Sequence, residues 1–436
     1  MKSENFDYVL KCYKESADDQ GVKFELSNVE FKDLVSNFCH QCNSTPTEHV
    51  YRKGSGGAFF YNRIEMEDKS KGYIKGNCVS CCGTCVIRKQ GFEPAAMRSS
   101  KPGYRTNKFL VTGGCGFIGS TIANRLLDQG KEVVVIDNLN SGKRENLKDH
   151  VNLTFIDCDL GDWDDLYQNC DMLTHIDTVF HTAAQAGIMP AILDPIQTHT
   201  SNVQGTFNLL QMMRIAGIPR IVYSASSSRY GNSEDLPLKE THPVSLMNPY
   251  SLTKYVAEEY CNTWSSQYGI DCVSLVYFNV YGPKERLSGD YATVIGKFHR
   301  QLLLEGRDLT IVGDGEARRD FTYIDDVVEA NLLAQEALVT SPEVVSRNKY
   351  NIGTGVNYSI NELSEMVLGS LADDIGPLST VTLPQRPSEA KETLADFSKA
   401  KEDLGWTSKI SLSKGLESEK EYYKAIYGYN DENSAS

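Results

Sequence analysis

A short apolar strand, a glycine-rich turn and a helical segment follow one another between residues 108 and 129. The strand is Lys108–Val111, and the turn reads Thr112-Gly113-Gly114-Cys115-Gly116-Phe117-Ile118-Gly119. Glycines at such a turn allow a helix to pack closely against the preceding strand. Strands alternate with helical patterns further on, at Glu132–Asp137, Leu153–Asp157, Thr178–His181, Arg220–Ala225 and Cys272–Phe278. This alternation predicts an α/β fold with a Rossmann-type, doubly wound parallel sheet.

The same turn has the features of a dinucleotide site. Gly113, Gly116 and Gly119 let the backbone approach a pyrophosphate, and the following helix offers amide donors at its positive end. Asp137 ends the next strand about twenty residues later, where a carboxylate binds the adenosine ribose and disfavours a 2′-phosphate. The spacing predicts NAD in preference to NADP. Ligands of such sheets bind at the carboxyl ends of strands, and three further turns fall there: Asp159-Leu160, Ala183-Ala184 and Ser226-Ser227-Ser228.

Tyr250 and Lys254 are four residues apart, and they therefore share one face of a helix. An ammonium beside a phenol stabilises the phenolate, so that a Tyr can act as a base. A pair of this kind standing alone is usually a solvated helix face. Its position after the glycine-rich turn, Asp137 and Ser226 favours catalysis instead.

Composition and charge restrict the class of protein. The 436 residues are 40% hydrophobic and 23% charged, which is ordinary for a soluble globular protein. We expect a cytosolic protein without a membrane span, because no apolar run reaches about 18 residues and no signal-peptide core is present. Residues 1–107 carry 16 Lys and Arg against 13 Asp and Glu, and the remainder carries 28 against 45. This acidic main body argues against nucleic acid as its ligand.

Cysteines cluster near the N-terminus in two Cys-x-x-Cys knuckles. Such knuckles suit a tetrahedral thiolate zinc site in a reducing compartment. Cys39, Cys42, Cys82 and Cys85 are our first choice of ligands, although Cys78 and Cys81 compete with the second pair. The knuckles, with Asn62-Arg63-Ile64, Lys71-Gly72-Tyr73 and Asn77, resemble the treble-clef zinc fold of HNH-type endonucleases. Residues 59–62 contain no His, so the resemblance implies a structural or docking module without DNA cleavage. The excess of Lys and Arg between residues 52 and 89 leaves nucleic-acid contact open for this module.

Gly113, Gly116 and Gly119, Asp137, Ser226, Tyr250 and Lys254 occur in the order used by the extended short-chain dehydrogenase/reductase family, which residues 108 to about 426 resemble. Its members act on nucleotide sugars. The resemblance implies that Tyr250 is the catalytic base, that Lys254 binds the nicotinamide ribose, and that Ser226 hydrogen-bonds the reacting sugar oxygen. It implies further cofactor-binding residues: Phe117, Ile118, Asn138, Asp159, Leu160, Ala183, Ala184, Asn202 and Tyr277.

The serine run discriminates among the family's reactions. Its 4,6-dehydratases carry Thr-Asp-Glu at the positions of Ser226, Ser227 and Ser228, and its nucleotide-glucuronate decarboxylases also have Glu at the third. Without a carboxylate at position 228, the resemblance implies 4-epimerisation of a UDP-sugar by oxidation and re-reduction at one carbon. Ser227 and Ser228 would line the substrate site, and Asn279, Arg319 and Arg386 would face the diphosphate.

Thr393 matches the position that gates the sugar pocket of the 4-epimerases, and a small residue there leaves room for an N-acetyl group. The resemblance favours UDP-N-acetylglucosamine or its uronic acid. UDP-glucuronate and UDP-glucose remain alternatives, since residues 183–188 look more like UDP-glucuronate 4-epimerases. A homodimer is expected through helices near Ile196–Ile215 and Tyr250–Gln267. The alternative from another class is an adaptor that binds nucleic acid or a partner through the zinc module.

These observations predict five segments. Residues 1–92 form a small zinc-binding α+β module, and residues 93–107 form a linker. Residues 108–282 form the NAD-binding domain, and residues 283–427 form a smaller substrate-binding lobe that is interleaved with it. Residues 428–436 form a polar tail.

Overall fold

The computed structural model describes residues 105–285, 292–375, 377–384 and 390–427, apart from the side chain of Asp373, and the backbone of four short strands nearer the N-terminus. The chain forms two compact units, Met1–Glu93 and Pro94–Ser436. In the first unit, β1 (Tyr51–Lys53) pairs antiparallel with β2 (Gly57–Phe59), and β3 (Arg63–Met66) pairs antiparallel with β4 (Cys78–Cys81). The predicted zinc ligands Cys39, Cys42, Cys82 and Cys85 lie outside the described residues.

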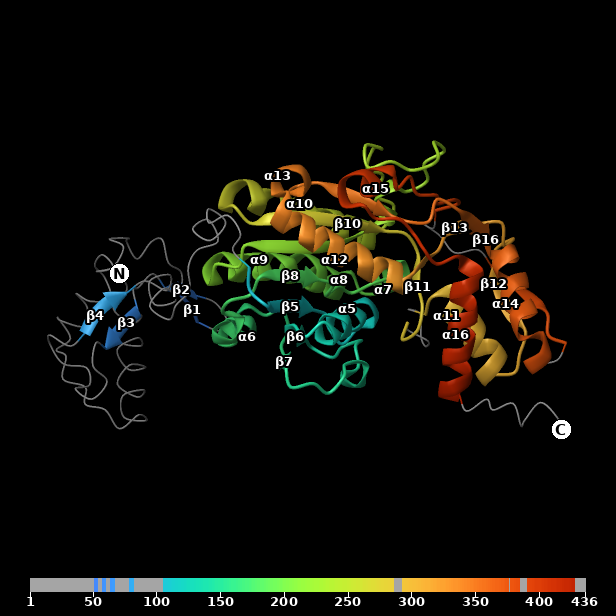
Figure 1. The fold of residues 1–436 in the computed structure, drawn as a ribbon, viewed down its shortest axis with the longest axis horizontal. Helices are drawn as coiled ribbons and strands as arrows, with labels where there is room; N and C mark the ends of the chain where they lie inside the picture. The colour runs from blue at the N-terminus through green and yellow to red at the C-terminus, as the bar shows by residue number, and fades with distance from the viewer. Residues whose placement is uncertain are drawn as a thin grey trace. The chain divides into compact units, whose positions relative to one another are not determined.

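A seven-stranded sheet forms the centre of the second unit (Figure 1). All of its strand pairs are parallel, in the order β15-β10-β9-β8-β5-β6-β7. The strands are β5 (Lys108–Thr112), β6 (Glu132–Asp137), β7 (Leu153–Asp157), β8 (Thr178–His181), β9 (Arg220–Ser226), β10 (Asp271–Tyr277) and β15 (Lys349–Ile352). The predicted parallel sheet is confirmed. Six strands come from the predicted segments, whereas β15 comes from the part assigned to the substrate lobe.

Helices cover both faces of this sheet, because a buried parallel sheet needs apolar cover on each side. On one face α5 (Phe117–Asp128) packs against α12 (Ile324–Thr340), which also contacts α13 (Pro342–Val345) and α15 (Ser398–Leu404). Helix α12, on the way from β10 to β15, shares the face of α5, whereas the crossovers from β8 to β9 and from β9 to β10 lie on the opposite face. These are α7 (Ile188–Leu193), α8 (Pro195–His199), the π-helix η5 (Thr200–Gln204), α9 (Gly205–Ala216) and α10 (Pro249–Tyr268), and α6 (Trp163–Gln168) packs on α9. The short 3₁₀ helices are η3 (Arg144–Asn146), η4 (Cys170–Leu173) and η6 (Ser227–Tyr230).

A smaller lobe is built from short strand pairs and four helical segments near the C-terminus, in yellow to red in Figure 1. β11 (Val280–Tyr281) pairs with β14 (Thr322–Tyr323), and β12 (Leu309–Val312) pairs with β17 (Thr380–Leu383), both in parallel. β13 (Arg318–Asp320) pairs antiparallel with β16 (Asn357–Ser359). The helical segments are α11 (Val294–His299), the π-helix η7 (Arg300–Leu304), α14 (Ile360–Ile375) and α16 (Leu412–Tyr427). After β10 the chain leaves the sheet and enters this lobe. It returns to the sheet at β15 and then enters the lobe a second time.

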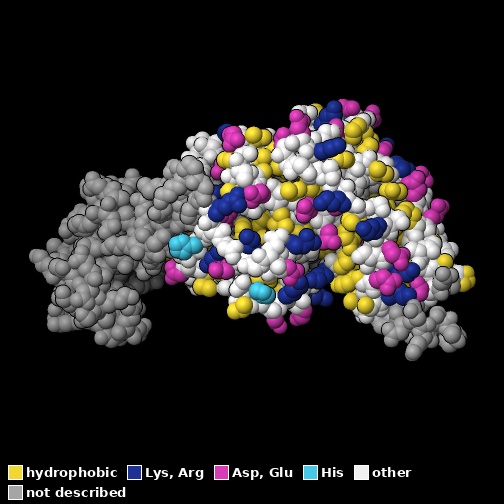
Figure 2. Space-filling view, in the orientation of Figure 1, with side chains coloured by type: hydrophobic (Ala, Val, Ile, Leu, Met, Phe, Trp, Pro, Cys, Tyr) yellow, Lys and Arg dark blue, Asp and Glu magenta, His cyan; other side chains and the backbone are white. Residues whose placement is uncertain are grey.

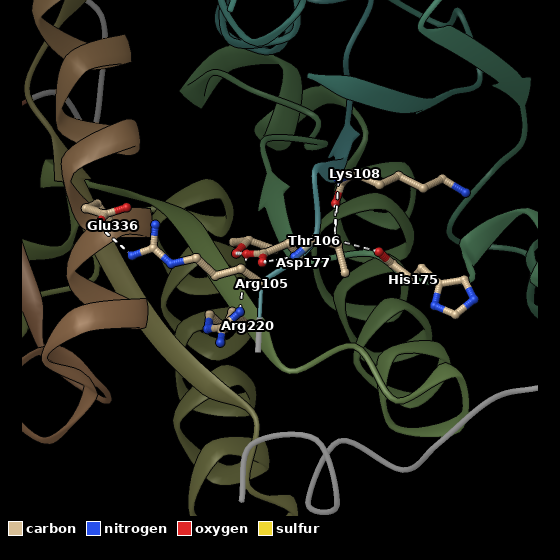
Figure 3. Close-up of polar contacts among 8 residues, drawn as sticks. Arg105, Thr106, Lys108, His175, Asp177, Arg220 and Glu336 are labelled. Atoms are coloured by element: carbon tan, nitrogen blue, oxygen red, sulfur yellow. Dashed lines mark hydrogen bonds and ion pairs between the residues drawn. The ribbon is translucent and has the colours of Figure 1, made fainter. Parts of the chain in front are cut away.

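The start of β5 is fastened at the amino-terminal edge of the sheet (Figure 3). The amide of Thr106 donates to Asp177 Oδ2 at 3.0 Å, and its hydroxyl donates to the carbonyl of His175 at 2.7 Å. Asp177 also forms a buried ion pair with Arg220, 3.2 Å between Oδ1 and Nη1. Arg105 points to Glu336 of α12 and pairs with it at 2.7 Å. Arg105 and Thr106, which immediately precede β5, are therefore bound at the edge of the sheet opposite the carboxyl ends of its strands.

Charged side chains of both signs are interspersed over the described body on the face drawn in Figure 2. A basic stripe of the kind that binds nucleic acid is not seen on that face of the described residues. The described helices include none that combines the length and the apolar character required to cross a membrane.

Candidate active site

The glycine-rich turn connects β5 to α5. It lies beside the end of β8, the neighbour of β5 at the point where the order of the strands reverses. Gly113 adopts φ +65°, and a Cβ atom on it would lie 2.6 Å from the Cα atom of Ala183. Only glycine allows this contact between the turn and the end of β8. Helix α5 begins at Phe117, and no side chain caps its first turn, which includes Ile118 and Gly119. An uncapped helix start beside a bare backbone turn provides amide donors for a pyrophosphate.

Asp137 and its neighbours form the adenosine side of the crevice. The Asp137 carboxylate accepts the amides of Cys115 at 2.8 Å and Leu139 at 2.8 Å. Burial raises the pKa of Asp137, and these two amide bonds oppose the rise. Asn138 donates from Nδ2 to Asp159 Oδ2 at 3.1 Å, which brings two predicted cofactor residues together. Leu160 follows them and is buried.

Tyr250 and Lys254 occupy the first turns of α10. Asn248 caps this helix in a reciprocal capping box with Ser251, which fixes where the helix begins and hence where Tyr250 points. Burial raises the pKa of the Tyr250 phenol, and a hydrogen bond with Ser226 opposes the rise. Burial also lowers the pKa of Lys254 to about 8. The structure therefore brings Ser226 and Tyr250 into contact.

The expected lowering of the Tyr250 pKa by Lys254 is not found. The Lys254 ammonium lies 4.6 Å from the centre of the Tyr223 ring, and it is absent from the causes that shift Tyr250. Desolvation outweighs the contribution of Ser226, so Tyr250 rests as a neutral phenol in this structure.

A buried hydrogen-bond chain joins the glycine-rich strand to η5. His181 lies between the hydroxyls of Thr112 (2.7 Å, at Nδ1) and Thr206 (2.9 Å, at Nε2). Thr206 gives its only proton to the carbonyl of Asn202 at 2.6 Å, so His181 Nε2 must be the donor to Thr206. Nδ1 then accepts from Thr112, and the ring is neutral. Burial supports this tautomer, since it lowers the pKa of His181 to about 3.

Asn202 continues this hydrogen-bond chain to α10, the helix that holds Tyr250 and Lys254. Its side-chain amide accepts from the Gln185 amide at 2.7 Å and donates to Thr253 Oγ1 at 3.0 Å. Thr253 in turn donates to the carbonyl of Tyr250 at 3.0 Å. The predicted cofactor residue Asn202 thus positions the first turn of α10 from a π-helical segment, a geometry common at functional sites. The sequence analysis did not single out Thr112, Thr206 or His181, because their types and spacing are ordinary for a core.

The serine run forms the turn between β9 and η6. Ser226 Oγ lies 2.9 Å from Ser228 Oγ and accepts the Ser228 amide at 3.2 Å. The next residue, Arg229, forms an ion pair with Glu258 of α10, with both carboxylate oxygens 2.6 Å from Nη1. Both side chains are buried. This pair, which the sequence analysis missed, joins the serine turn to the helix that holds Tyr250, and it commits the Glu258 carboxylate to an arginine.

The predicted substrate residues are distributed over the start of the small lobe. Asn279 is exposed just after β10. Arg319, on β13, donates from Nη1 to the carbonyls of Arg318 at 2.9 Å and Lys391 at 3.2 Å. Thr393 lies beside the same strand, buried, with Oγ1 accepting from the Asp320 amide at 3.4 Å. Arg319 and Thr393 are therefore neighbours, whereas Arg386 lies outside the described residues.

The side chain of Tyr277 is held in the core. Its hydroxyl lies 3.1 Å from Ser224 Oγ and is bonded to the amide of Asn331. Among the residues that the structure describes, no group of three or more His, Cys, Asp or Glu side chains could hold a metal ion. The zinc prediction concerns cysteines outside that part of the chain.

The bare turn, the uncapped start of α5 and the carboxylate at the end of β6 together fit a dinucleotide with free ribose hydroxyls. Residues 109–353 match the model of the NAD dependent epimerase/dehydratase family. The chain belongs to this family.

Relatives of the chain include UDP-sugar 4-epimerases and, at 32% identity, two UDP-glucuronic acid decarboxylases of Arabidopsis thaliana. A putative UDP-glucose 4-epimerase of Methanocaldococcus jannaschii is 37% identical, over 70% of this chain and 95% of the relative. The crystal structure of Thermotoga maritima UDP-glucose 4-epimerase with UDP-glucose is 35% identical, with a TM-score of 0.67, and covers 73% of this chain and 99% of its own. The UDP-N-acetylglucosamine 4-epimerase of Methanobrevibacter ruminantium, in complex with UDP-N-acetylmuramic acid, is 33% identical, with a TM-score of 0.66, over 74% and 100%.

Proposed function

We propose that this chain is an NAD-dependent UDP-sugar 4-epimerase that acts on UDP-N-acetylglucosamine or its uronic acid. The observation that carries the proposal is the hydrogen bond between Tyr250 and Ser226, in a turn whose third residue is Ser228. A phenol and a serine hydroxyl that meet at one point can bind and deprotonate a single sugar hydroxyl.

In this reaction Tyr250 takes the proton of the C4 hydroxyl and later returns it. Ser226 hydrogen-bonds the same oxygen, and Lys254 supplies a buried ammonium one helical turn away. The glycine-rich turn, Asp137 and Lys254 would hold NAD, which would supply reversible hydride transfer at C4. Between the two half-reactions the 4-keto sugar turns over in the pocket, and no atom is lost.

Elimination and decarboxylation are disfavoured by the side chains around the serine turn. Ser226, Ser227 and Ser228 offer hydroxyl groups only. Glu258 of α10 lies next to this turn through its contact with Arg229, but its carboxylate is buried and paired with that arginine. A leaving hydroxyl must receive a proton from a general acid, and the resemblance assigns that role in the 4,6-dehydratases to carboxyl groups that Ser227 and Ser228 replace here. Proton transfer by Tyr250 alone suits epimerisation.

The proposed substrate class follows from residues of the small lobe. Arg319 and Arg386 would bind the diphosphate through their planar guanidinium groups, with Asn279 beside them. Thr393 would border the sugar and leave space for an N-acetyl group. UDP-glucuronate and UDP-glucose are the alternative substrates, the former because of the sequence Ala183-Ala184-Gln185-Ala186-Gly187-Ile188.

The remaining parts of the proposal concern the organisation of the chain. Residues 108–282 would bind NAD, and residues 283–427 would cover the substrate. Residues 93–107 and 428–436 would act as linker and tail. A homodimer would form through α8, α9 and α10, a proposal supported by Ile196 of α8, which is 79% exposed, and Leu252 of α10, which is 49% exposed.

Residues 1–92 would bind zinc through Cys39, Cys42, Cys82 and Cys85. A second role, as an adaptor for nucleic acid or a partner, is favoured by the Lys and Arg excess at residues 52–89. Metal analysis of the full-length protein, and a salt-dependent gel shift with it, test these two points; a metal-free protein or the absence of binding at low salt would refute them.

Product analysis tests the central proposal. The full-length protein should convert at least one of UDP-N-acetylglucosamine, its uronic acid, UDP-glucuronate and UDP-glucose to the C4 epimer, separated by chromatography, with no net reduction of NAD. The matched control is Tyr250→Phe, which should keep its NAD and react at least about a hundredfold more slowly. The absence of a C4 epimer from every one of these sugars would refute the proposal.

A further inference from the structure

The turn Gly282–Glu285, at the point where the chain enters the small lobe, has a fixed conformation. Gly282 adopts φ +145°, and a Cβ atom on it would lie 2.5 Å from Ile324 Cγ2. The amide of Glu285 closes the turn on the carbonyl of Gly282 at 3.2 Å. Lys284 adopts φ +75°, which is unfavourable for a residue with a Cβ atom. Such strain persists only where surrounding contacts impose it.

One such contact crosses to the cofactor side of the sheet. The ammonium of Lys284 donates to the carbonyl of Asn146 at 2.9 Å, although the two residues are 138 positions apart. Asn146 belongs to residues 138–147, the loop after Asp137, which we call the adenosine-side loop. Its side chain donates to the carbonyl of Cys115, in the glycine-rich turn, at 2.9 Å. Its carbonyl also accepts from Asn124 of α5 at 2.9 Å.

The other side of the turn is held by the small lobe. Tyr423 of α16 donates its hydroxyl to Glu285 Oε1 at 3.0 Å, and both side chains are buried. Lys284 thus extends from a turn that is anchored in one lobe to a loop that borders the predicted adenosine site in the other. The bond is half-buried, and burial lowers the pKa of Lys284, with the charge of Lys148 adding to the effect.

We propose that Lys284 is a positioning residue for cofactor retention: it fastens the adenosine-side loop to the small lobe and thereby slows the release of NAD. The inference rests on the proposed function, since an epimerase must keep one cofactor through oxidation and re-reduction. Release of a dinucleotide from this crevice requires the loop after β6 to move away from the glycine-rich turn. Lys284 opposes that movement through the Asn146 carbonyl, the same oxygen that accepts from Asn124, and it is the donor that comes from the small lobe.

The test measures how fast the full-length protein loses NAD. The holoenzyme is diluted into buffer with an NAD-consuming enzyme, and the NAD still bound is quantified over time. Lys284→Met removes the ammonium and keeps most of the stem. Lys284→Arg keeps a donor and serves as the rescue variant. Lys148→Met is the matched control, because Lys148 follows the same loop but pairs with exposed Asp128 at 2.6 Å.

Lys284→Met should lose NAD about tenfold faster than the wild type, the effect expected for a hydrogen bond from a charged donor. Lys284→Arg should recover most of the retention, and Lys148→Met should release NAD at the wild-type rate. With saturating NAD in the assay, Lys284→Met should regain the wild-type kcat, which a general loss of structure would not allow. Thermal melts at saturating NAD check that the variants fold, and Lys284→Gln is measured beside Lys284→Met as a second uncharged variant.

Equal release rates for the wild type and both uncharged variants at position 284 would overturn the proposal while leaving epimerisation intact. Equally fast release from Lys148→Met would overturn it too, because a general effect of loop charge would then explain the data. A wild-type protein that neither retains nor binds NAD would overturn the proposed function and this inference together.

Discussion

Glu285→Gln should stabilise the protein at alkaline pH and have much less effect at acidic pH. Glu285 and Glu419 are both buried, 3% and 0% exposed. Burial raises the pKa of Glu285 to about 7, from an ordinary value of 4.5. Burial and then the charge of Glu285 raise that of Glu419. The His299 ring, whose centre lies 4.9 Å from that of Tyr423, brings no positive charge, because burial lowers the pKa of His299 to about 4.

The magnitude follows from proton linkage. Because the folded state holds its proton more tightly than the unfolded state, the carboxyl costs nothing well below pH 4.5, and the cost reaches its full value above about pH 7. A difference of 2.5 pKa units, from 4.5 to about 7, corresponds to about 3 kcal/mol above pH 8, and to about 1 kcal/mol near pH 5. Gln removes this titration and keeps an acceptor for the Tyr423 hydroxyl.

Denaturant unfolding at about pH 5 and about pH 8.5 measures the effect. The gain from Glu285→Gln should be about 2 kcal/mol larger at the higher pH. Glu421→Gln is the matched control, since Glu421 is an exposed carboxyl of α16, the helix that also holds Glu419 and Tyr423. A change in stability that is the same at both pH values, or that matches the control, would show that Glu285 is ionised in the folded protein at little cost.

Three further changes follow from the site. Thr393→Tyr should lower kcat/KM for an N-acetylated sugar relative to a plain hexose by at least about tenfold, because the added ring fills the space beside β13. A selectivity equal to that of the wild type would show that Thr393 does not border the bound sugar. Glu258→Gln should cost about 3 kcal/mol of stability, because it leaves Arg229 buried without a countercharge, and a stability within about 1 kcal/mol of the wild type in thermal melts would contradict this. The rate should fall as pH rises through about 8, where Lys254 loses its proton, and a kcat that stays constant up to about pH 10 would exclude a role for its charge.

Local chemistry was readable from the sequence where residues close together in the chain suffice. Gly113, Asp137, Tyr250 and Lys254 were located from turn glycines, strand ends and helical spacing, and six strands of the sheet were found in this way. β15 was missed because its four residues are short and lie among irregular elements. Its strand character comes from pairing with β10, some seventy residues earlier, which local pattern does not report.

The electrostatics of the site could not be predicted in the same way. The spacing of Tyr250 and Lys254 predicts a lowered phenol pKa, but the direction depends on burial. The structure places the Lys254 ammonium over Tyr223, and desolvation then dominates Tyr250. The pairing of Arg229 with Glu258 escaped notice for a related reason, since neither residue type implies burial and their partnership requires the turn after β9 to meet α10.

The sequence by itself determined six strands of the parallel sheet and the residues proposed to bind the cofactor and to react, because these depend on glycine conformations, helix periodicity and residue chemistry within short stretches. Only the tertiary structure decided which groups are desolvated, which carboxylates are paired, and how the two lobes meet. The contact of Lys284 with Asn146 joins residues that lie more than a hundred positions apart. Such contacts depend on the packing of whole elements, and that packing is set by burial of the core and not by any local pattern.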